Sequence, residues 1–237
     1  MKDIVDILRQ LDEQLLLAIN SMHTPFGDSF MSDFSGRIIW LGLYVAIFYA
    51  LVRRFGWIRA LVWGAGAGLV ILFADQICAS VIRPVVERMR PSNLDNPLSS
   101  LIHIVEGHRG GLYGFPSCHA ANTIGAAIYL SLVFRRLRFT IFILAWALVT
   151  CWSRMYLGVH YPGDLFVGGV IGASGAFLFY FAARYVIIRY LHRRPDEFPD
   201  SVNNSLWLRL SGPFVPSDVP IVVGLFTVFW MVVSAAI

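Results

Sequence analysis

Charged residues are scarce in this sequence. Asp, Glu, Lys and Arg make up only 14% of its 237 residues, whereas a soluble domain has about 25%. Hydrophobic residues make up 57%, and the mean hydropathy is +0.65. This composition excludes an ordinary soluble globular protein. The formal net charge is only +4, and we expect no nucleic-acid partner.

Cysteine is also scarce, with three residues at Cys78, Cys118 and Cys151. Their number is odd, and no two of them are spaced as in a Cys-x-x-Cys motif. This pattern excludes a disulfide framework and a zinc site.

We expect no cleavable signal peptide, because four acidic residues interrupt the first twenty positions. Residues 1–36 are instead predicted to form an N-terminal amphipathic segment. Ile4, Leu8, Leu11 and Leu15 fall near one face of a helix there. Such a helix either lies on the membrane surface or packs beside the rest of the protein.

Long apolar blocks dominate the rest of the chain. A helix needs about 20 apolar residues to cross the roughly 30 Å hydrocarbon core of a bilayer. Six blocks are long enough to cross or nearly cross it, the third and fourth being short: 38–52, 58–82, 119–134, 139–152, 165–188 and 219–237. We therefore predict an all-α, polytopic integral membrane bundle of about six transmembrane helices, forming one domain over residues 1–237.

Arginine clusters indicate how the blocks cross the membrane. They occupy the first, third and fifth loops: Arg53, Arg54 and Arg59; Arg135, Arg136 and Arg138; Arg189, Arg193 and Arg194. The positive-inside rule assigns these loops to the cytoplasm. The second and fourth loops, about 83–118 and 153–164, and both termini then face outward.

The outward loops hold three polar segments, and the first is RPVVERMRP, which begins at Arg83. Arg83 and Arg90 are seven residues apart, so a short helix would place both guanidinium groups on one face about 10 Å apart. Pro84 suits the first turn of such a helix, and Pro91 would end it. Two arginines on one face can hold a phosphate group, unless Glu87 neutralises them both.

The second segment is GFPSCHA, residues 114–120. Ser117 is a favoured N-cap for a helix that begins near His119, and the free N–H groups of that first turn can bind an anion. His119 could donate a proton to a leaving group. The alternative is a capping serine beside an interfacial histidine.

Cys118 lies between these two residues. A cysteine-dependent phosphatase requires an arginine six residues after the cysteine, and that position is Ile124. A papain-like pair is also disfavoured, because the Cys and His of such enzymes lie far apart in sequence. We interpret Cys118 as a small residue that fills a tight turn.

The third segment is SRMYLGVHYPGD, residues 153–164. Arg154 can bind an anion, and His160 precedes Asp164 by four residues. The carboxylate can then accept a hydrogen bond from one imidazole nitrogen and fix the tautomer, which frees the other nitrogen to attack. We predict that His160 is a nucleophile, because three arginines and a second histidine lie on the same membrane face.

The order and spacing of these segments resemble the signature of the type 2 phosphatidic acid phosphatase superfamily, in its membrane lipid phosphatase branch. That signature reads Lys-x6-Arg-Pro, then Pro-Ser-Gly-His, then Ser-Arg-x5-His-x3-Asp. The chain matches the third part completely. It departs once in each of the others, with Arg83 in place of the lysine and Cys118 in place of the glycine. The signature region covers residues 83–164.

The resemblance implies a role for each residue. His160 attacks phosphorus and becomes a phosphohistidine, Asp164 orients it, and His119 protonates the leaving oxygen and then assists hydrolysis. The phosphoryl oxygens are held by Arg83, Arg90, Arg154, Ser117 and the backbone N–H groups around Cys118. The resemblance implies no metal ion and no other cofactor.

A site at the outer membrane boundary implies a lipid with a phosphorylated head group. The candidates are polyprenyl diphosphate, phosphatidylglycerol phosphate, phosphatidic acid and the phosphates of lipid A, and the charge of three arginines favours a diphosphate. We expect hydrolysis at the extracytoplasmic side of a bacterial inner membrane, with no obligate protein partner. Three alternatives stay open: a phosphotransferase that uses the same phosphohistidine, a vanadate-dependent haloperoxidase, and a non-catalytic protein that binds or transports lipid phosphates.

The second loop is rich in glycine, which suggests a mobile flap beside this site: Gly107, Gly110, Gly111 and Gly114. On the same loop, His103, His108 and Arg109 could contact a head group.

Overall fold

The chain folds into helices joined by loops, as the sequence predicts. The computed structural model describes residues 2–191 and 213–237, and no β-strand forms within them. The helices are α1 (Lys2–Asn20), α2 (Pro25–Ser35), α3 (Leu41–Phe55), α4 (Trp57–Asp75), α5 (Arg83–Val86), α6 (Cys118–Phe134), α7 (Leu137–Tyr156), α8 (Pro162–Tyr190) and α10 (Val219–Ala236). A π-helical stretch, Gln76–Ile82, joins α4 to α5, and short 3₁₀ turns cover Ile38–Trp40, Pro97–Leu101 and Pro216–Asp218.

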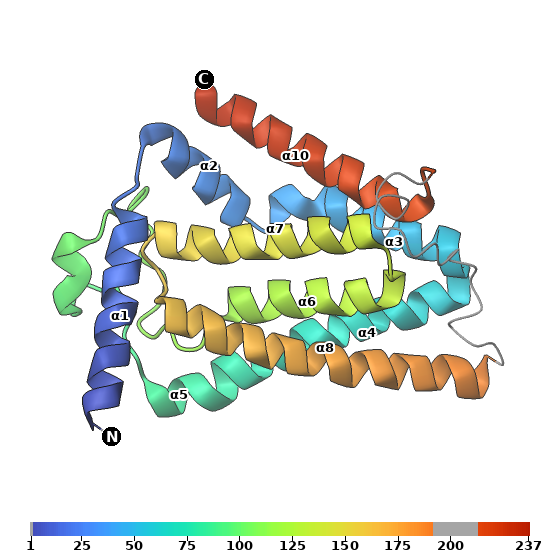
Figure 1. Cartoon of the computed structure of the whole chain (residues 1–237), viewed down its shortest axis with the longest axis horizontal. Coiled ribbons are helices and arrows are strands. Elements are labelled where there is room, and N and C mark those ends of the chain that lie inside the picture. The colour runs from blue at the N-terminus through green and yellow to red at the C-terminus, as the bar shows by residue number, and fades with distance from the viewer. Residues whose placement is uncertain (1, 192–212) are drawn as a thin grey trace.

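The long helices form a membrane bundle, with α3, α4, α6, α7, α8 and α10 running roughly along the long axis of the molecule (Figure 1). Five described segments are long and apolar enough to cross a membrane: Ile38–Phe55, Trp57–Val86, Leu137–Tyr156, Pro162–Tyr190 and Pro216–Ala236. α6 is shorter, at 17 residues, as expected for the third block. The fourth block is longer than expected, because α7 runs for 20 residues. The chain is a multi-pass membrane protein.

Small residues bring α6 and α8 into close contact. A Cβ atom on Gly172 would lie 2.1 Å from the backbone oxygen of Ala121, and one on Gly168 would lie 2.5 Å from that of Ser117. Such close helix crossings require residues without side-chain bulk. The crossing holds the first turn of α6 against the beginning of α8, which is where two of the polar segments enter the bundle.

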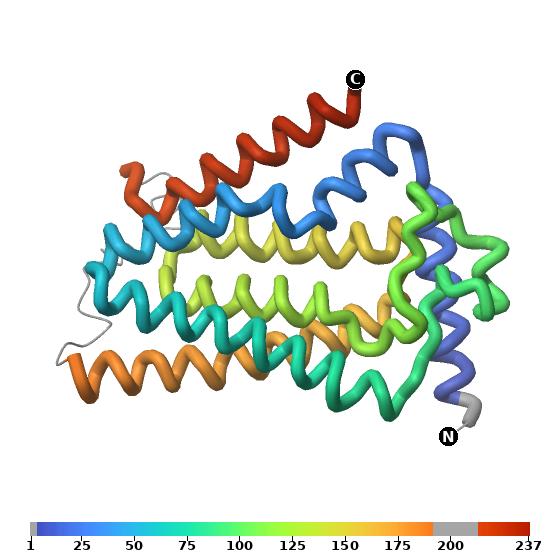
Figure 2. Tube along the Cα trace, turned by 180° about the vertical axis from the view of Figure 1, so that it is seen from behind, coloured from blue at the N-terminus to red at the C-terminus, as the bar shows by residue number. Residues whose placement is uncertain are grey.

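α1 lies across one end of the bundle rather than within it (Figures 1 and 2). One face of α1 buries Leu16 against Ile102 and Tyr161. The predicted apolar residues lie exposed elsewhere on the helix: Ile4, Leu8, Leu11 and Leu15. An exposed apolar stripe is typical of a helix in the membrane interface. One part of α1 therefore packs beside the rest of the protein, and a position of its exposed stripe at the membrane surface stays a prediction.

The two ends of the bundle carry different groups. The polar segments lie at the end that α1 crosses, whereas the α3–α4 and α6–α7 turns, with their arginine clusters, lie at the far end (Figure 2). Arg189 ends α8 at that same far end, and Arg193 and Arg194 lie outside the described residues. The polar loops and the arginine clusters of the far turns are thus separated by the length of the bundle.

Candidate active site

The three polar segments meet at the end of the bundle that α1 crosses. The first leaves α5, the second begins α6, and the third forms the turn between α7 and α8. Backbone hydrogen bonds join the two ends of the long loop between α5 and α6. The N–H of Arg90 donates to the carbonyl of Leu112 at 3.1 Å, and the N–H of Gly114 donates to that of Arg88 at 2.9 Å.

Arg83 and Arg90 do not share a helix, and that prediction is wrong. α4 continues through the π-helical stretch to the end of α5, where Glu87 takes a left-handed φ of 48°. Pro84 lies in the first turn of α5, where a proline is tolerated, and Pro91 disfavours a helical conformation at the residue before it. Glu87 is exposed and forms no ion pair with either arginine among the described residues. The two arginines reach the site from different elements.

Arg90 binds the predicted nucleophile directly. Its Nη1 donates to Nε2 of His160 at 2.7 Å and to the carbonyl of Val159 at 3.0 Å. Nδ1 of His160 donates to Oδ2 of Asp164 at 3.3 Å. A guanidinium can only donate, so these contacts select the tautomer with the proton on Nδ1 and the lone pair on Nε2.

The surroundings of His160 keep its imidazole neutral. The residue is 1% exposed. Burial, followed by the positive charges of Arg90, Arg154 and Arg83, holds the pKa of His160 well below its usual range. Burial also lowers the pKa of Arg90, with a further contribution from Arg83. A neutral imidazole with an unprotonated nitrogen is the reactive form of a histidine nucleophile.

Asp164 is buried in the first turn of α8 and is held from several directions. Besides its contact with His160, Oδ2 accepts from the N–H of Tyr161 at 3.0 Å. Oδ1 accepts from Nη1 of Arg88 at 3.0 Å. With both oxygens bonded, the carboxylate has a defined orientation toward His160.

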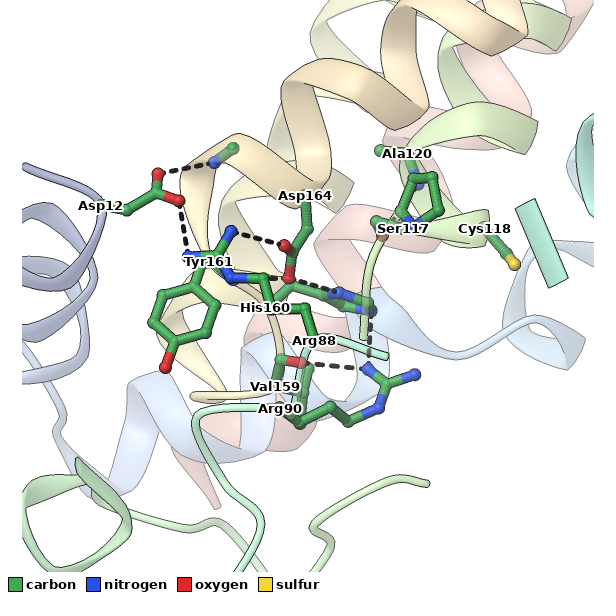
Figure 3. A network of polar contacts seen from close by, with 12 residues as sticks. Asp12, Arg88, Arg90, Ser117, Cys118, Ala120, Val159, His160, Tyr161 and Asp164 are labelled. Atoms are coloured by element: carbon green, nitrogen blue, oxygen red, sulfur yellow. Dashed lines mark hydrogen bonds and ion pairs between the residues drawn. The ribbon is translucent and has the colours of Figure 1, made fainter. Parts of the chain in front are cut away.

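Arg88 is a site residue that the sequence analysis missed. Its Nη2 donates to Oδ2 of Asp12 at 2.8 Å, and its Cζ lies 3.9 Å from the ring centroid of Tyr161. The other oxygen of Asp12 accepts from the N–H of Gly163 at 2.8 Å. Figure 3 shows how α1 reaches the α7–α8 turn through these contacts. No pattern in the sequence could connect Asp12 to Arg88, because 76 residues separate them.

Gly114 belongs to the site rather than to a mobile flap. A Cβ atom there would lie 3.0 Å from Cγ of Arg90, 3.4 Å from Oδ2 of Asp164 and 3.5 Å from Nδ1 of His160. Gly111, by contrast, has nothing within 4 Å of such an atom. The flap interpretation therefore does not extend to Gly114, which is buried.

The second segment begins α6 as predicted. Ser117 is the N-cap, and its Oγ accepts from the N–H of Ala120 at 3.4 Å. The N–H of Ser117 donates to the carbonyl of Asp164 at 3.0 Å. This bond ties the start of α6 to the start of α8 and places His119 in the first turn of α6.

Cys118 points away from His160 (Figure 3). Its Sγ accepts from Nη2 of Arg83 at 3.0 Å, and the same nitrogen donates to the carbonyl of Pro116 at 3.0 Å. The thiol therefore positions Arg83. The interpretation of Cys118 as merely a small residue in a turn is incomplete.

A pocket of about 360 Å³ opens beside His119 and Arg154. Arg154 is 8% exposed, and its Nη1 donates to Oγ of Ser35 at the end of α2. The remaining lining comes from α2, the long loop and the α7–α8 turn: Ser32, Gly36, Val105, Glu106, His108 and Leu157. Sequence patterns gave no reason to place α2 here, because Ser35 and Arg154 are 119 residues apart.

Of the loop residues considered above, only His108 lines this pocket. His103 bonds through Nε2 to Oδ2 of Asp28 at 2.8 Å. Nη1 of Arg109 donates to the carbonyl of Ser92 at 2.8 Å, within the loop. His103 and Arg109 therefore hold the loop in place.

Three arginines at the site each have an Nε donor without a bond to the part of the protein that the structure describes. The Nε atoms of Arg83, Arg90 and Arg154 are buried and have no hydrogen-bond partner among the described residues. Buried donors are normally bonded, and donors from several guanidinium groups suit a multi-oxygen anion. Arg37 is close enough to act electrostatically on His119 and Arg154. Across residues 2–191 and 213–237, no three His, Cys, Asp or Glu residues form a group that could hold a metal ion.

The sequence matches the PAP2 superfamily over residues 63–188. That range includes all three polar segments and covers more than half of the chain. The chain belongs to the PAP2 superfamily. The family expected from the spacing of the motifs is confirmed.

Two bacterial proteins resemble the chain over most of its length. The Lipid A 4'-phosphatase of Bacteroides thetaiotaomicron is 49% identical over 185 residues, which are 78% of this chain and 82% of that protein. The Lipid A 4'-phosphatase of Porphyromonas gingivalis is 28% identical over 215 residues, which are 91% and 84% of the two chains. Family membership and these relatives identify this PAP2 protein as a lipid phosphatase, an enzyme that hydrolyses phosphoric monoesters.

The fold of this PAP2 phosphatase also matches a solved structure, the crystal structure of Aquifex aeolicus LpxE. The TM-score is 0.53 at 23% sequence identity, and the match covers 70% of this chain and 92% of the other. At that identity the likeness concerns the fold, and it confirms the helical membrane bundle.

Proposed function

We propose that this enzyme removes a phosphate monoester from the head group of a membrane lipid, with lipid A as its first candidate substrate. The contact between Nε2 of His160 and Nη1 of Arg90, at 2.7 Å, carries the proposal. It directs a neutral imidazole lone pair at one of the cationic groups that a phosphate would contact.

In this mechanism His160 attacks phosphorus through Nε2 and forms a phosphohistidine, as the family resemblance implies. Arg90 leaves Nε2 when substrate binds and donates to a phosphoryl oxygen. Asp164 keeps the proton on Nδ1 and stabilises the positive charge that the imidazole acquires. His119 protonates the leaving oxygen and then activates the water that hydrolyses the intermediate.

The remaining phosphate contacts come from Arg83, Arg154 and the start of α6. Both arginines have a buried Nε without a partner among the described residues. Ser117 and the first-turn N–H groups, including that of Cys118, supply further donors at a positive helix end. Such fixed donors carry most of the catalysis, because phosphoryl transfer depends mainly on positioning and electrostatic stabilisation.

The names of the two bacterial relatives support lipid A over the other lipid phosphates. Its 4'-phosphate is a monoester on a glucosamine disaccharide. This choice replaces the preference for a diphosphate, which rested on a terminal phosphoryl group that leaves readily and on the charge of three arginines. Three arginines can equally neutralise a dianionic monoester.

We further propose that the site faces the extracytoplasmic side of a bacterial inner membrane and that residues 1–237 form one phosphatase domain. The arginine-rich turns at the opposite end of the bundle support this orientation. The bonds of Asp12 to Arg88 and Gly163 support including the N-terminal segment in the domain. A reporter fused after Ile237 should give an extracytoplasmic signal, and a cytoplasmic signal would reverse the orientation.

The test of the function is phosphate release by the purified protein from polyprenyl diphosphate, phosphatidylglycerol phosphate, phosphatidic acid and lipid A, beside His160→Ala. We expect the highest kcat/KM with lipid A and a loss of at least about 10³-fold in the variant. Rapid quenching should trap phosphate on His160 of the wild type. Absence of release from every lipid would overturn hydrolysis, and transfer to an added lipid alcohol would favour the phosphotransferase.

A further inference from the structure

We propose that the pocket beside His119 is a carbohydrate subsite that binds the sugar ring from which the phosphate is removed. We call it the α2 pocket, because Ser32, Ser35 and Gly36 at the end of α2 form one of its walls. The inference rests on the proposed phosphatase function and specifies the chemistry of the group attached to the phosphate.

The direction of the reaction places the leaving group in the α2 pocket. In phosphoryl transfer the attacking and leaving atoms lie roughly in line on opposite sides of phosphorus. His119, which protonates the leaving oxygen, lines the pocket, whereas the nucleophile His160 is buried and does not. The alcohol that departs with the leaving oxygen therefore lies on the His119 side of the phosphate.

The lining of the pocket suits a carbohydrate. The hydroxyl of Ser32, the carboxylate of Glu106 and the imidazole of His108 can exchange hydrogen bonds with several sugar hydroxyls. Val105 and Leu157 add apolar surface against which the C–H face of a ring can pack. A polyprenyl chain offers these side chains no hydrogen-bonding groups, and a glycerol unit would reach fewer of them.

The size of the pocket limits what enters it. Its volume of about 360 Å³ lies at the lower end of the roughly 300–1,000 Å³ that small-molecule sites occupy. A sugar ring fits this volume, while the acyl chains of a lipid do not and stay in the bilayer. Arg154 lies at the junction with the phosphate site. Its Nη1 is bonded to Ser35 and its Nε has no partner among the described residues.

The test compares kcat/KM for lipid A with kcat/KM for phosphatidic acid, a lipid phosphate monoester without a sugar. Ser32→Leu narrows the pocket, and Glu106→Gln removes its carboxylate. We expect the lipid A to phosphatidic acid ratio to fall about tenfold in each variant. Glu87→Gln is the matched control, because Glu87 is also an exposed glutamate of the long loop with positive φ (48°, against 51° for Glu106). The ratio of kcat/KM for lipid A to kcat/KM for phosphatidic acid in Glu87→Gln should equal that of the wild type.

Binding separates this inference from the function on which it rests. His160→Ala protein in nanodiscs should retain lipid A more tightly than phosphatidic acid, and adding Ser32→Leu should remove that difference. If the wild type binds lipid A more tightly than phosphatidic acid but releases no phosphate, the proposed hydrolysis is overturned and the subsite is supported. Normal hydrolysis with an unchanged ratio in both Ser32→Leu and Glu106→Gln would overturn the subsite alone.

Discussion

Arg88 links Asp164, the hydrogen-bond partner of the proposed nucleophile His160, to the N-terminal helix. Its Nη1 lies 3.0 Å from Oδ1 of Asp164, while its Nη2 lies 2.8 Å from Oδ2 of Asp12. The side chain of Asp164 is 1% exposed and that of Arg88 is 26% exposed. Solvent therefore screens the ion pair between Arg88 and Asp12 more than the ion pair between Arg88 and Asp164. Through Asp12, α1 supports the turn that carries His160 as well as covering it.

Loosening this link should slow the chemical step. We expect Asp12→Asn to lower kcat about tenfold and Arg88→Leu about a hundredfold, with smaller changes in KM, because both displace Asp164 without contacting substrate. Steady-state kinetics on lipid A measure the effect. Glu13→Gln is the control, since Glu13 forms an exposed pair with Arg9 (3.1 Å) that contributes little. Equal kinetics in Asp12→Asn and Glu13→Gln would exclude a positioning role for α1.

His160 should remain neutral in mildly acidic solution. An ordinary histidine gains a proton near pH 6.5, but burial and neighbouring arginines hold the pKa of His160 well below that value. NMR of protein with ¹⁵N-labelled histidine should show an unprotonated Nε2 at about pH 5, with the signal assigned through its loss in His160→Gln. A resonance that titrates near pH 6.5 would contradict the assigned environment.

The lowered pKa of His160 also affects the stability of the protein. The native protein binds a proton at His160 less readily than the unfolded chain does. The contribution of His160 to stability is therefore present above about pH 6.5 and is lost as the pH falls below it. The midpoint of thermal unfolding should fall more steeply with acidification in the wild type than in His160→Gln.

Gly114→Ala should impair catalysis because the new methyl group would crowd Arg90, Asp164 and His160. Its carbon would lie 3.0 Å from Cγ of Arg90, tighter than an ordinary contact. We expect kcat to fall about tenfold to a hundredfold as these groups move apart. Gly111→Ala is the matched control from the same loop, with nothing within 4 Å of the added carbon. Similar losses in both variants would point to loop flexibility instead of crowding.

The two departures from the family signature should be coupled. Cys118→Gly removes an acceptor from Nη2 of Arg83, and we expect kcat/KM to fall about threefold to tenfold. The double variant with Arg83→Lys carries the lysine and glycine of the family signature. Its kcat/KM should recover part of that loss, so that the effects of the two substitutions are not additive. Cys118→Ser keeps an acceptor and should remain close to the wild type. A loss of more than about a hundredfold in Cys118→Ser would instead implicate the thiol in the reaction.

Local patterns predicted the parts of the site whose contacts are local. The cap at Ser117 spans three residues and the His160–Asp164 bond spans four, so spacing alone was sufficient. The same reasoning failed for Arg83 and Arg90, because it assumed a helix through both. The left-handed φ of Glu87 ends the helix between them.

By itself the sequence determined the membrane bundle, the family and the three polar segments, because hydropathy and short spacings are properties of contiguous residues. Only the tertiary structure decided which other groups enter the site. Asp12 lies 76 residues before Arg88, and Ser35 lies 119 residues before Arg154. No periodicity links positions so far apart, and they meet only because α1 and α2 fold back over the end of the bundle.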